Sequence, residues 1–264
     1  MSTETVYLQR DQPDGVPPLA LTGERTLPDV PEENYWFRRH LIVYEHIRAR
    51  VGGLRVVDMA CGEGYGTDVL GRTAASVVGV DANPEAHEHA RLKYTRPGVR
   101  FARDLVETFD EPCDAVVFLQ TIEHVQDPDA ILERFRSLVT ADAEPGRPGV
   151  AYVSTPNLLT LAPPGAEKSE NPWHVKEYRA QEFRELCEAH FEHVEILGLF
   201  HARKLAVHAF AIDRLRWDDV HKGLRITKPF YDWFTPAITE SDFVLSADRD
   251  LDEALDFLAV CRTS

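Results

Sequence analysis

Two apolar runs, each ending on an acid, hold the residues of this chain best suited to chemistry. In Leu54–Gly66 an apolar run ends at Asp58 and leads into a turn of small residues with alternating glycines. In Val77–Asp81 a second apolar run again closes on an acid. A glycine turn between a strand and a helix brings bare backbone and a helix N-terminus close to a ligand. An acid at the tip of the next strand can accept hydrogen bonds from ribose hydroxyls, so the pattern predicts a nucleoside cofactor.

The acids around this turn argue against a dinucleotide. A dinucleotide fingerprint needs a third glycine three residues after the second, but that position holds Thr67, and the glycine falls at Gly66. A dinucleotide also places its pyrophosphate at the helix N-terminus, where Asp58 and Glu63 would repel it. The same acids suit a ligand with an ammonium and a sulfonium. An NAD-dependent reductase is therefore kept only as the alternative.

Five motifs in order along the chain resemble those of the class I S-adenosylmethionine-dependent methyltransferases. They are Val56–Gly66, Val80–Asn83, Arg103–Asp104, Asp114–Val125 and Val153–Asn157. The resemblance runs from about residue 35 to the end of the chain. The first position of the turn is often glycine in this family, whereas this chain has Ala60. The resemblance implies methyl transfer with S-adenosylmethionine as cofactor and S-adenosylhomocysteine as product.

Other segments are similar to a narrower group, the actinobacterial methyltransferases associated with methylglucose lipopolysaccharide assembly. The similar segments are Thr22–Thr26, Glu33–His40, Asn171–His174, Gly198–His201 and Asp248–Asp252. This similarity implies O-methylation of a saccharide hydroxyl, in polysaccharide biosynthesis. An aromatic or natural-product acceptor is the alternative within the same class of enzymes.

The family resemblance implies roles for residues at the ends of the first two strands. Asp58 and the backbone of Ala60, Gly62 and Gly64 are expected to line the methionine part of the cofactor. For Asp58, capping of the turn is the alternative. Asp81 is expected to accept hydrogen bonds from the ribose 2′- and 3′-hydroxyls.

Four further cofactor contacts are implied in the same way. Ala82 would flank the adenine, and Asp104 would accept a hydrogen bond from the adenine amino group, unless it only caps a short helical turn. Gln120, at the end of the fourth strand, is expected near the methionine end or the methyl group. Arg38 either holds the cofactor carboxylate or is a solvated helix arginine.

Methyl transfer to a hydroxyl calls for a general base. The hydroxyl has a high pKa, so a base helps by roughly 10²–10⁴-fold, and histidine is the natural choice near neutral pH. The candidates are His124 with Glu123 after the fourth strand, His174 in a later loop, and His201. Each has a structural or acceptor-binding role as its alternative. We rank His124 and His174 ahead of His201.

The sequence does not predict a metal site. In some ubiquinone-pathway relatives the motif that ends in Glu-His begins with Glu and holds a divalent metal, but here it begins with Gln120, a weaker and neutral ligand. The cysteines show no zinc-ligand spacing. They are Cys61, Cys113, Cys187 and Cys261, and we interpret them as free thiols in a reducing cytosol.

Composition limits the partners and the location. The 264 residues are 44% hydrophobic and 28% charged, as in an ordinary globular protein. The net charge of −15 argues against a nucleic acid or an anionic membrane as partner. The N-terminus has no basic or apolar run, and no segment reaches membrane-spanning length. We therefore expect a soluble, cytoplasmic protein that acts on a small molecule or saccharide, while the oligomeric state stays open.

Alternating strands and helices must position these residues. Strands are expected at 54–59, 76–81, 99–103, 113–119, 149–154, 191–200 and 255–262. Helices are expected at 64–72, 84–95, 127–139 and 180–190, after an amphipathic N-terminal cap helix over 32–50. Strands separated by helices of this length predict a parallel, doubly wound α/β sheet with right-handed crossovers. With the family resemblance, this is a seven-stranded Rossmann-like fold.

Three parts of the chain differ in character. Residues 1–33 are polar and rich in proline, so we expect an N-terminal arm or lid, within which 22–26 is either a lid segment or a plain loop. Residues 34–264 are expected to form the methyltransferase domain that the resemblance implies. Within it, residues 201–250 are too long for a hairpin and are expected to cap the acceptor site.

Overall fold

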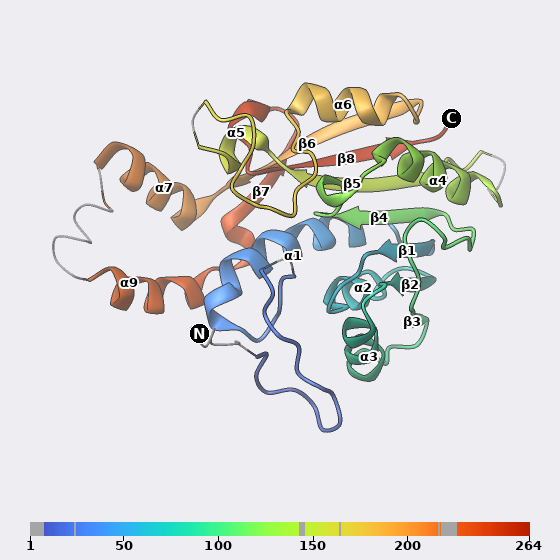
Figure 1. Ribbon diagram of the computed structural model, residues 1–264, viewed down its shortest axis with the longest axis horizontal. Helices are drawn as coiled ribbons and strands as arrows, with labels where there is room; N and C mark the ends of the chain where they lie inside the picture. The colour runs from blue at the N-terminus through green and yellow to red at the C-terminus, as the bar shows by residue number, and fades with distance from the viewer. Residues whose placement is uncertain (1–7, 24, 143–145, 164, 216, 218–225) are drawn as a thin grey trace.

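A mixed β-sheet forms the centre of the molecule. The computed structural model describes residues 8–23, 25–142, 146–163, 165–215, 217 and 226–264. Eight strands in these residues form one sheet with the order β3-β2-β1-β4-β5-β8-β6-β7 (Figure 1). The strands are β1 (Arg55–Met59), β2 (Ser76–Val80), β3 (Val99–Ala102), β4 (Ala115–Leu119), β5 (Val150–Pro156), β6 (His193–His201), β7 (Phe243–Ser246) and β8 (Asp256–Arg262).

Helices cover both faces of this sheet. They are α1 (Asn34–Arg48), α2 (Tyr65–Leu70), α3 (Pro84–Lys93), α4 (Pro128–Thr140), α5 (Leu158–Leu161), α6 (Ala180–Glu188), α7 (Arg203–Leu215) and α9 (Thr227–Phe234). Val56 packs in a cluster with residues of α1 and α2, whereas the next residue, Val57, packs with residues of α4 and α6. Successive residues of a strand point to opposite faces. Because both faces are buried, the two strand residues before Asp58, Val56 and Val57, are both apolar.

The first five strands confirm the predicted parallel arrangement. β1 pairs in parallel with β2 and with β4, β2 pairs with β3, and β4 pairs with β5. The carboxyl ends of parallel strands meet at one edge of a sheet, which is where ligands bind in doubly wound folds. Asp58, Asp81 and Gln120 end or follow β1, β2 and β4, so the topology brings them to the same edge.

The predicted doubly wound, Rossmann-like α/β fold is confirmed, and the sheet adds two features to the seven strands expected. The C-terminal strand β8 lies between β5 and β6 and runs antiparallel to both. An eighth strand, β7, lies inside the expected insertion and pairs antiparallel with β6, from Gly198↔Ser246 to His201↔Phe243. β7 has only four residues and lies at the sheet edge. So short a run has no periodicity of its own to set it apart from the surrounding loop.

Two helices of the insertion project from this edge. α7 and α9 extend together away from the sheet (Figure 1). The His208 ring stacks on the rings of Phe230 and Phe234, 5.7 and 4.9 Å away between centroids. The Trp233 side chain is 72% exposed. Three of these aromatic residues therefore form a small stack between the two helices, and Trp233 faces outward.

The N-terminal segment is packed onto the domain. Leu19, Leu27 and Val30 are buried in a cluster of their own. The buried Gln9 side chain donates through Nε2 to Glu63 Oε1 at 2.9 Å, and the His89 ring lies 2.7 Å from the Pro17 carbonyl oxygen. We call the described part of residues 8–33 the strap.

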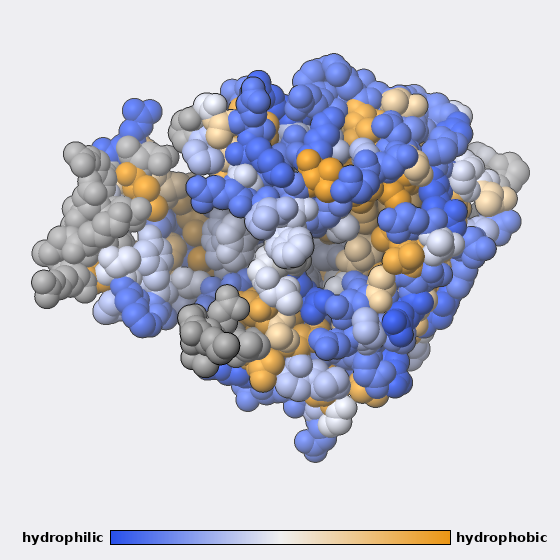
Figure 2. Space-filling view, in the orientation of Figure 1, coloured by the Kyte–Doolittle hydropathy of each residue, from blue (hydrophilic) through white to orange (hydrophobic). Residues whose placement is uncertain are grey.

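The face seen in Figure 2 is largely hydrophilic, with hydrophobic residues in scattered groups. Among the helices of the described residues, none combines the length and the apolar character needed to cross a bilayer.

Candidate active site

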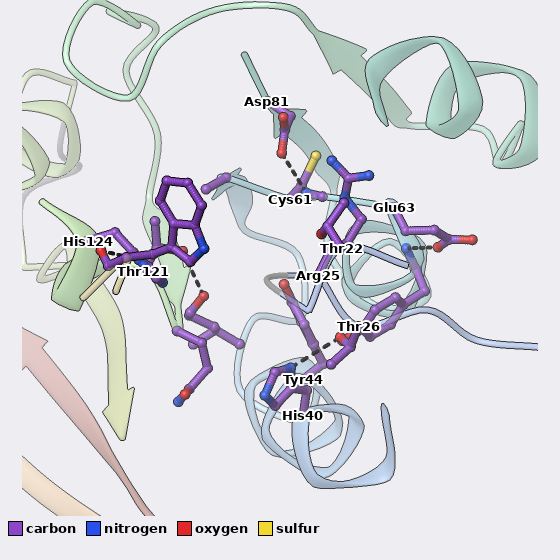
Figure 3. A pocket seen from close by; sticks show the side chains of 16 residues that line it. Thr22, Arg25, Thr26, His40, Tyr44, Cys61, Glu63, Asp81, Thr121 and His124 are labelled. Carbon is purple, nitrogen blue, oxygen red and sulfur yellow. Dashed lines mark hydrogen bonds between the residues drawn. The ribbon is translucent and has the colours of Figure 1, made fainter. Parts of the chain in front are cut away.

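A cavity of about 490 Å³ opens at the carboxyl edge of the parallel strands. Its walls come from the strap, α1, the turn after β1, the ends of β2 and β4, and one later loop residue. Thr22, Arg25 and Thr26 lie on the opposite side of the cavity from Thr121 and His124 (Figure 3). The other lining residues are His40, Tyr44, Ala60, Cys61, Gly62, Glu63, Tyr65, Asp81, Leu119, Gln120 and Trp173.

Backbone conformation explains the small residues of the turn after β1. Ala60, Gly62 and Gly64 have φ angles of +55°, +56° and +97°. This left-handed region costs a residue with a side chain roughly 1–2 kcal/mol, which fits the frequent glycine at the position of Ala60 in the resembling family. A Cβ on Gly64 would lie 2.8 Å from the Ala90 Cβ. The turn therefore needs glycine at position 64 for both its conformation and its packing.

Gly66 has a different reason to lack a side chain. A Cβ at this position would lie 2.1 Å from the Tyr44 Cζ atom. The absence of a side chain lets α2 approach α1 closely enough for the Tyr44 hydroxyl to donate to Asp58 Oδ1 at 3.2 Å.

Asp58 lies behind the cavity wall and not among the lining residues. Its side chain is fully buried and also accepts a hydrogen bond from Thr67 Oγ1 at 2.7 Å. Burial raises the pKa of Asp58 to about 7, although the hydrogen bonds from Thr67 and Tyr44 act to lower it and the charge of Asp81 adds to the rise. Contact between Asp58 and the methionine part of a cofactor stays a prediction.

This buried carboxyl makes stability depend on pH. The pKa of Asp58 in the folded chain exceeds its ordinary value of 3.8, so between these values the folded state binds more protons than the unfolded state. The contribution of Asp58 to the free energy of unfolding is fully present below pH 3.8 and is lost as the pH rises through about 7. Because of Asp58, the free energy of unfolding of the wild-type chain should fall between pH 5 and 8. We expect Asp58→Asn to remove on the order of 2–3 kcal/mol of that fall. Urea denaturation at several pH values measures this, and parallel curves for the two proteins would contradict it.

Asp81 lines the cavity and also holds the turn together. Its Oδ2 accepts from the Gly62 N–H and its Oδ1 from the Asn83 N–H, both at 2.8 Å. Each carboxylate oxygen can accept a further hydrogen bond, as two ribose hydroxyls would require. Ala82 is exposed beside it and is not a lining residue.

Asp104 lies outside the cavity lining. Its Oδ1 accepts from Thr108 Oγ1 at 2.6 Å and from the Leu105 N–H at 2.8 Å, and these bonds hold its pKa below the usual range. This is the local arrangement that the capping alternative describes. The contact of Asp104 with an adenine amino group stays a prediction.

Gln120 has a left-handed backbone conformation at the end of β4. Its φ angle is +50°, and its backbone N–H and side-chain Nε2 both donate to Ser154 Oγ, at 3.0 and 3.1 Å. These bonds tie the end of β4 to β5. Gln120 and the next residue, Thr121, thereby become part of the cavity wall.

Two of the three candidate histidines, His124 and His174, are in contact, and His201 lies apart from them. His124 lines the cavity, and its Nδ1 lies 3.1 Å from the Trp173 carbonyl oxygen. The His174 ring packs edge-on against His124 at 4.9 Å, but His174 is buried and is not a lining residue. His201, at the end of β6, has its Nε2 2.8 Å from the Tyr35 hydroxyl and lies outside the lining too.

Arg38 and Arg25 are placed differently from the sequence expectation. Arg38 donates through Nη1 to Glu240 Oε2 at 3.1 Å and is not a lining residue. Arg25 lines the cavity instead. Sequence reasoning noted residues 22–26 only as a candidate lid segment and gave no role to Arg25. The only clue in the sequence was that Arg25 is a basic residue in Thr22–Thr26, a segment similar to the actinobacterial methyltransferases described above.

Comparison with known proteins now decides the family. A family model described as a methyltransferase domain matches residues 28–209. A probable S-adenosylmethionine-dependent methyltransferase of Mycolicibacterium smegmatis is 38% identical over 264 residues, which cover 94% of this chain and 97% of that protein. The chain belongs to the S-adenosylmethionine-dependent methyltransferases.

Two further similarities agree with this assignment. A probable S-adenosylmethionine-dependent methyltransferase of Mycobacterium tuberculosis is 36% identical over 252 residues, 92% of this chain and 89% of that protein. A solved S-adenosylmethionine-dependent methyltransferase of Thermotoga maritima, described as a possible histamine N-methyltransferase, has a TM-score of 0.55 at 16% identity and covers 88% of this chain and 95% of its own. At that identity the second similarity shows the fold alone.

S-adenosylmethionine is therefore the cofactor of this methyltransferase, and the cavity suits it. The cofactor is a nucleoside with a charged amino-acid tail. The cavity lining offers Asp81 as an acceptor, the bare backbone of Gly62, and a permanent cation, Arg25. The residues that would hold each part are those around the turn after β1.

Three possible metal ligands also meet in this methyltransferase. One ligand atom from each of Glu123, His124 and His174 lies within 4.8 Å of the other two. The fit is incomplete, because His174 Nδ1 lies 2.6 Å from Glu177 Oε1 and its Nε2 lies 3.0 Å from Asn171 Nδ2. His174 could ligate only if the Asn171 amide moved, so we assign no step to a metal.

Proposed function

We propose that this methyltransferase transfers the methyl group to a hydroxyl oxygen of a saccharide or another small molecule, with His124 as the general base. The observation that carries the choice is the contact between His124 Nδ1 and the Trp173 carbonyl oxygen at the cavity wall. A carbonyl oxygen only accepts hydrogen bonds, so Nδ1 holds the proton of the neutral ring and Nε2 holds the lone pair. The tautomer is therefore the one that lets Nε2 accept a proton.

The other candidate bases are less suited to this role. Because His174 Nδ1 donates to Glu177, its Nε2 is the acceptor of the Asn171 amide hydrogen. His201 is hydrogen-bonded to Tyr35 outside the lining. Glu123 is buried, and its backbone carbonyl accepts from the N–H groups of residues 175 and 176. Glu123 and His174 thus support the loop against which His124 rests.

The chain's own residues align the reactants and receive the proton. When bound, S-adenosylmethionine supplies an electrophilic methyl group attached to a sulfonium sulfur. The acceptor oxygen would displace the sulfur from the methyl carbon, and S-adenosylhomocysteine would be the leaving group. Holding an acceptor in line contributes up to about 7–11 kcal/mol in favourable cases. His124 Nε2 takes the hydroxyl proton as the oxygen–carbon bond forms. Trp173, 65% exposed beside His124, offers a flat face on which a sugar ring can pack.

An acceptor screen tests this function. S-adenosylmethionine with a labelled methyl group is incubated with the protein and with saccharides, phenols, amines or carboxylates. We expect label in a saccharide, in a product that resists alkali. A methyl ether at a non-anomeric hydroxyl would also resist acid, whereas a methyl glycoside at the anomeric hydroxyl would be acid-labile. Label only in a phenol would favour an aromatic acceptor, and transfer only to an amine or a carboxylate would contradict the proposal. Binding of NAD(H) without binding of S-adenosylhomocysteine would favour the reductase instead.

A further inference from the structure

Arg25 has no acidic partner among the residues that the structure describes. Other arginines, among them Arg39 with Asp256 and Arg96 with Asp68, form ion pairs in the core or on the surface. Arg25 is half-buried at the cavity wall and makes no hydrogen bond or ion pair with any residue that the structure describes. In a chain with a net charge of −15, an arginine that lines a cavity without an acid is positioned for an anionic ligand.

The charges of the cavity wall point to the same conclusion. Glu63 and Asp81 are acids of the lining. Burial lowers the pKa of His40 to about 4, so its ring is neutral at pH 7. Arg25 is thus the one permanent cation among the lining residues. The cofactor of this family carries a carboxylate, and a buried carboxylate needs a charged partner.

The position of Arg25 matches the amino-acid part of the cofactor. A Cβ placed on Gly62 would lie 3.6 Å from the Arg25 Cγ atom, so the arginine chain runs along the turn after β1. The N–H of Gly62 is bonded to Asp81, which is where we expect the ribose. Arg25 therefore lies beside the backbone that we expect to contact the methionine part.

The strap holds Arg25 in this position. The next residue, Thr26, has its Oγ1 2.9 Å from the Tyr65 hydroxyl and 3.2 Å from His40 Nδ1. On the far side of the turn, Glu63 accepts from Gln9 of the strap and from Lys93 of α3. Burial acts to raise the pKa of Glu63, but hydrogen bonds from its neighbours lower it below the usual range. The strap is thereby tied to the charged form of an acid in the turn.

We propose that the Arg25 guanidinium binds the carboxylate of S-adenosylmethionine and S-adenosylhomocysteine, and that the strap is a wall of the cofactor site. A guanidinium can donate two parallel hydrogen bonds to a carboxylate, which gives orientation as well as attraction. The inference rests on the cofactor of the family and not on the proposed acceptor or base. A failed acceptor screen therefore leaves it standing.

Two ligands that differ only in the amino-acid part test the proposal. Isothermal titration measures S-adenosylhomocysteine and 5′-methylthioadenosine, which lacks the carboxylate, against the intact chain. We expect Arg25→Ala to weaken the binding of S-adenosylhomocysteine by about 10–100-fold. The affinity for 5′-methylthioadenosine should change less than about twofold. Arg25→Lys should recover part of the loss, because it keeps the charge but not the planar pair of donors.

Matched variants decide between the possible outcomes. Arg91→Ala removes an exposed arginine paired with Glu88 on α3 and should alter neither ligand. If Arg25→Ala weakens both ligands equally, Arg25 acts on the strap or the nucleoside and the proposal is wrong. It is also wrong if Arg25→Ala changes neither ligand, or if Arg38→Ala shows the selective loss instead.

Discussion

Replacing His124 by alanine is expected to lower kcat for methyl transfer by about 10²–10⁴-fold, the contribution of a general base. The affinity for S-adenosylhomocysteine should change little, because the lost group is the one that receives the acceptor's proton. Steady-state kinetics with the acceptor found by the screen measure the first quantity, and isothermal titration measures the second.

The pH dependence separates a base from a residue that only shapes the cavity. A base must be unprotonated to act, so the rate of the wild-type enzyme should fall on the acid side. His124→Ala should lose that fall along with most of the activity. His201→Ala, outside the cavity lining, provides the comparison. The proposal fails if His124→Ala keeps more than a tenth of the wild-type kcat, or if only His174→Ala abolishes activity and the acid limb together.

Replacing Asp81 by alanine is expected to weaken the binding of S-adenosylhomocysteine by about 10²–10⁴-fold. Two hydrogen bonds from ribose hydroxyls to a carboxylate contribute roughly 1.5–3 kcal/mol each, and the same change removes the acceptor of the Gly62 N–H at 2.8 Å. Asp81→Asn keeps one acceptor oxygen, so its loss should be smaller. Isothermal titration gives both affinities.

Net charge and folding need their own controls in this experiment. Asp248→Ala removes an acid of the same type from an exposed turn after β7 and should leave the affinity unchanged. Urea denaturation shows whether Asp81→Ala remains folded. Unchanged binding of S-adenosylhomocysteine by a folded Asp81→Ala protein would remove Asp81 from the cofactor site.

The local parts of the fold could be predicted from the sequence because local physics determines them. A strand buried on both faces must be apolar along its length, and a turn with left-handed residues favours glycine, so β1, the turn to Gly66 and β2 are visible in the residues alone. The polar residues at the ends of the strands identified the cavity edge. Asp81 and Gln120 are lining residues, whereas the buried Asp58 lies behind the cavity wall.

The parts that the sequence could not reveal depend on contacts between distant segments. Arg25 reaches the cavity because Leu27 and Val30 pack the strap against the domain and Thr26 meets Tyr65, and no spacing along the chain encodes these contacts. Arg38 points to Glu240, two hundred and two positions away. The order of the histidines as candidate bases likewise rests on partners such as the Trp173 carbonyl, which only the fold brings to them.

The pairing of His201 with Phe243 bears on which part of such an enzyme can vary among relatives. The chain leaves the sheet at one end of this pair and returns at the other, so the two ends of the excursion through α7 and α9 lie side by side. An excursion between adjacent ends can lengthen, shorten or be exchanged without shifting the register of the sheet, and added loop length costs little closure entropy. The opposite end of the sheet, with the turn after β1, is untouched by such an exchange. The segment through α7 and α9 can therefore diverge among relatives, or be grafted between them, while the turn after β1 stays the same.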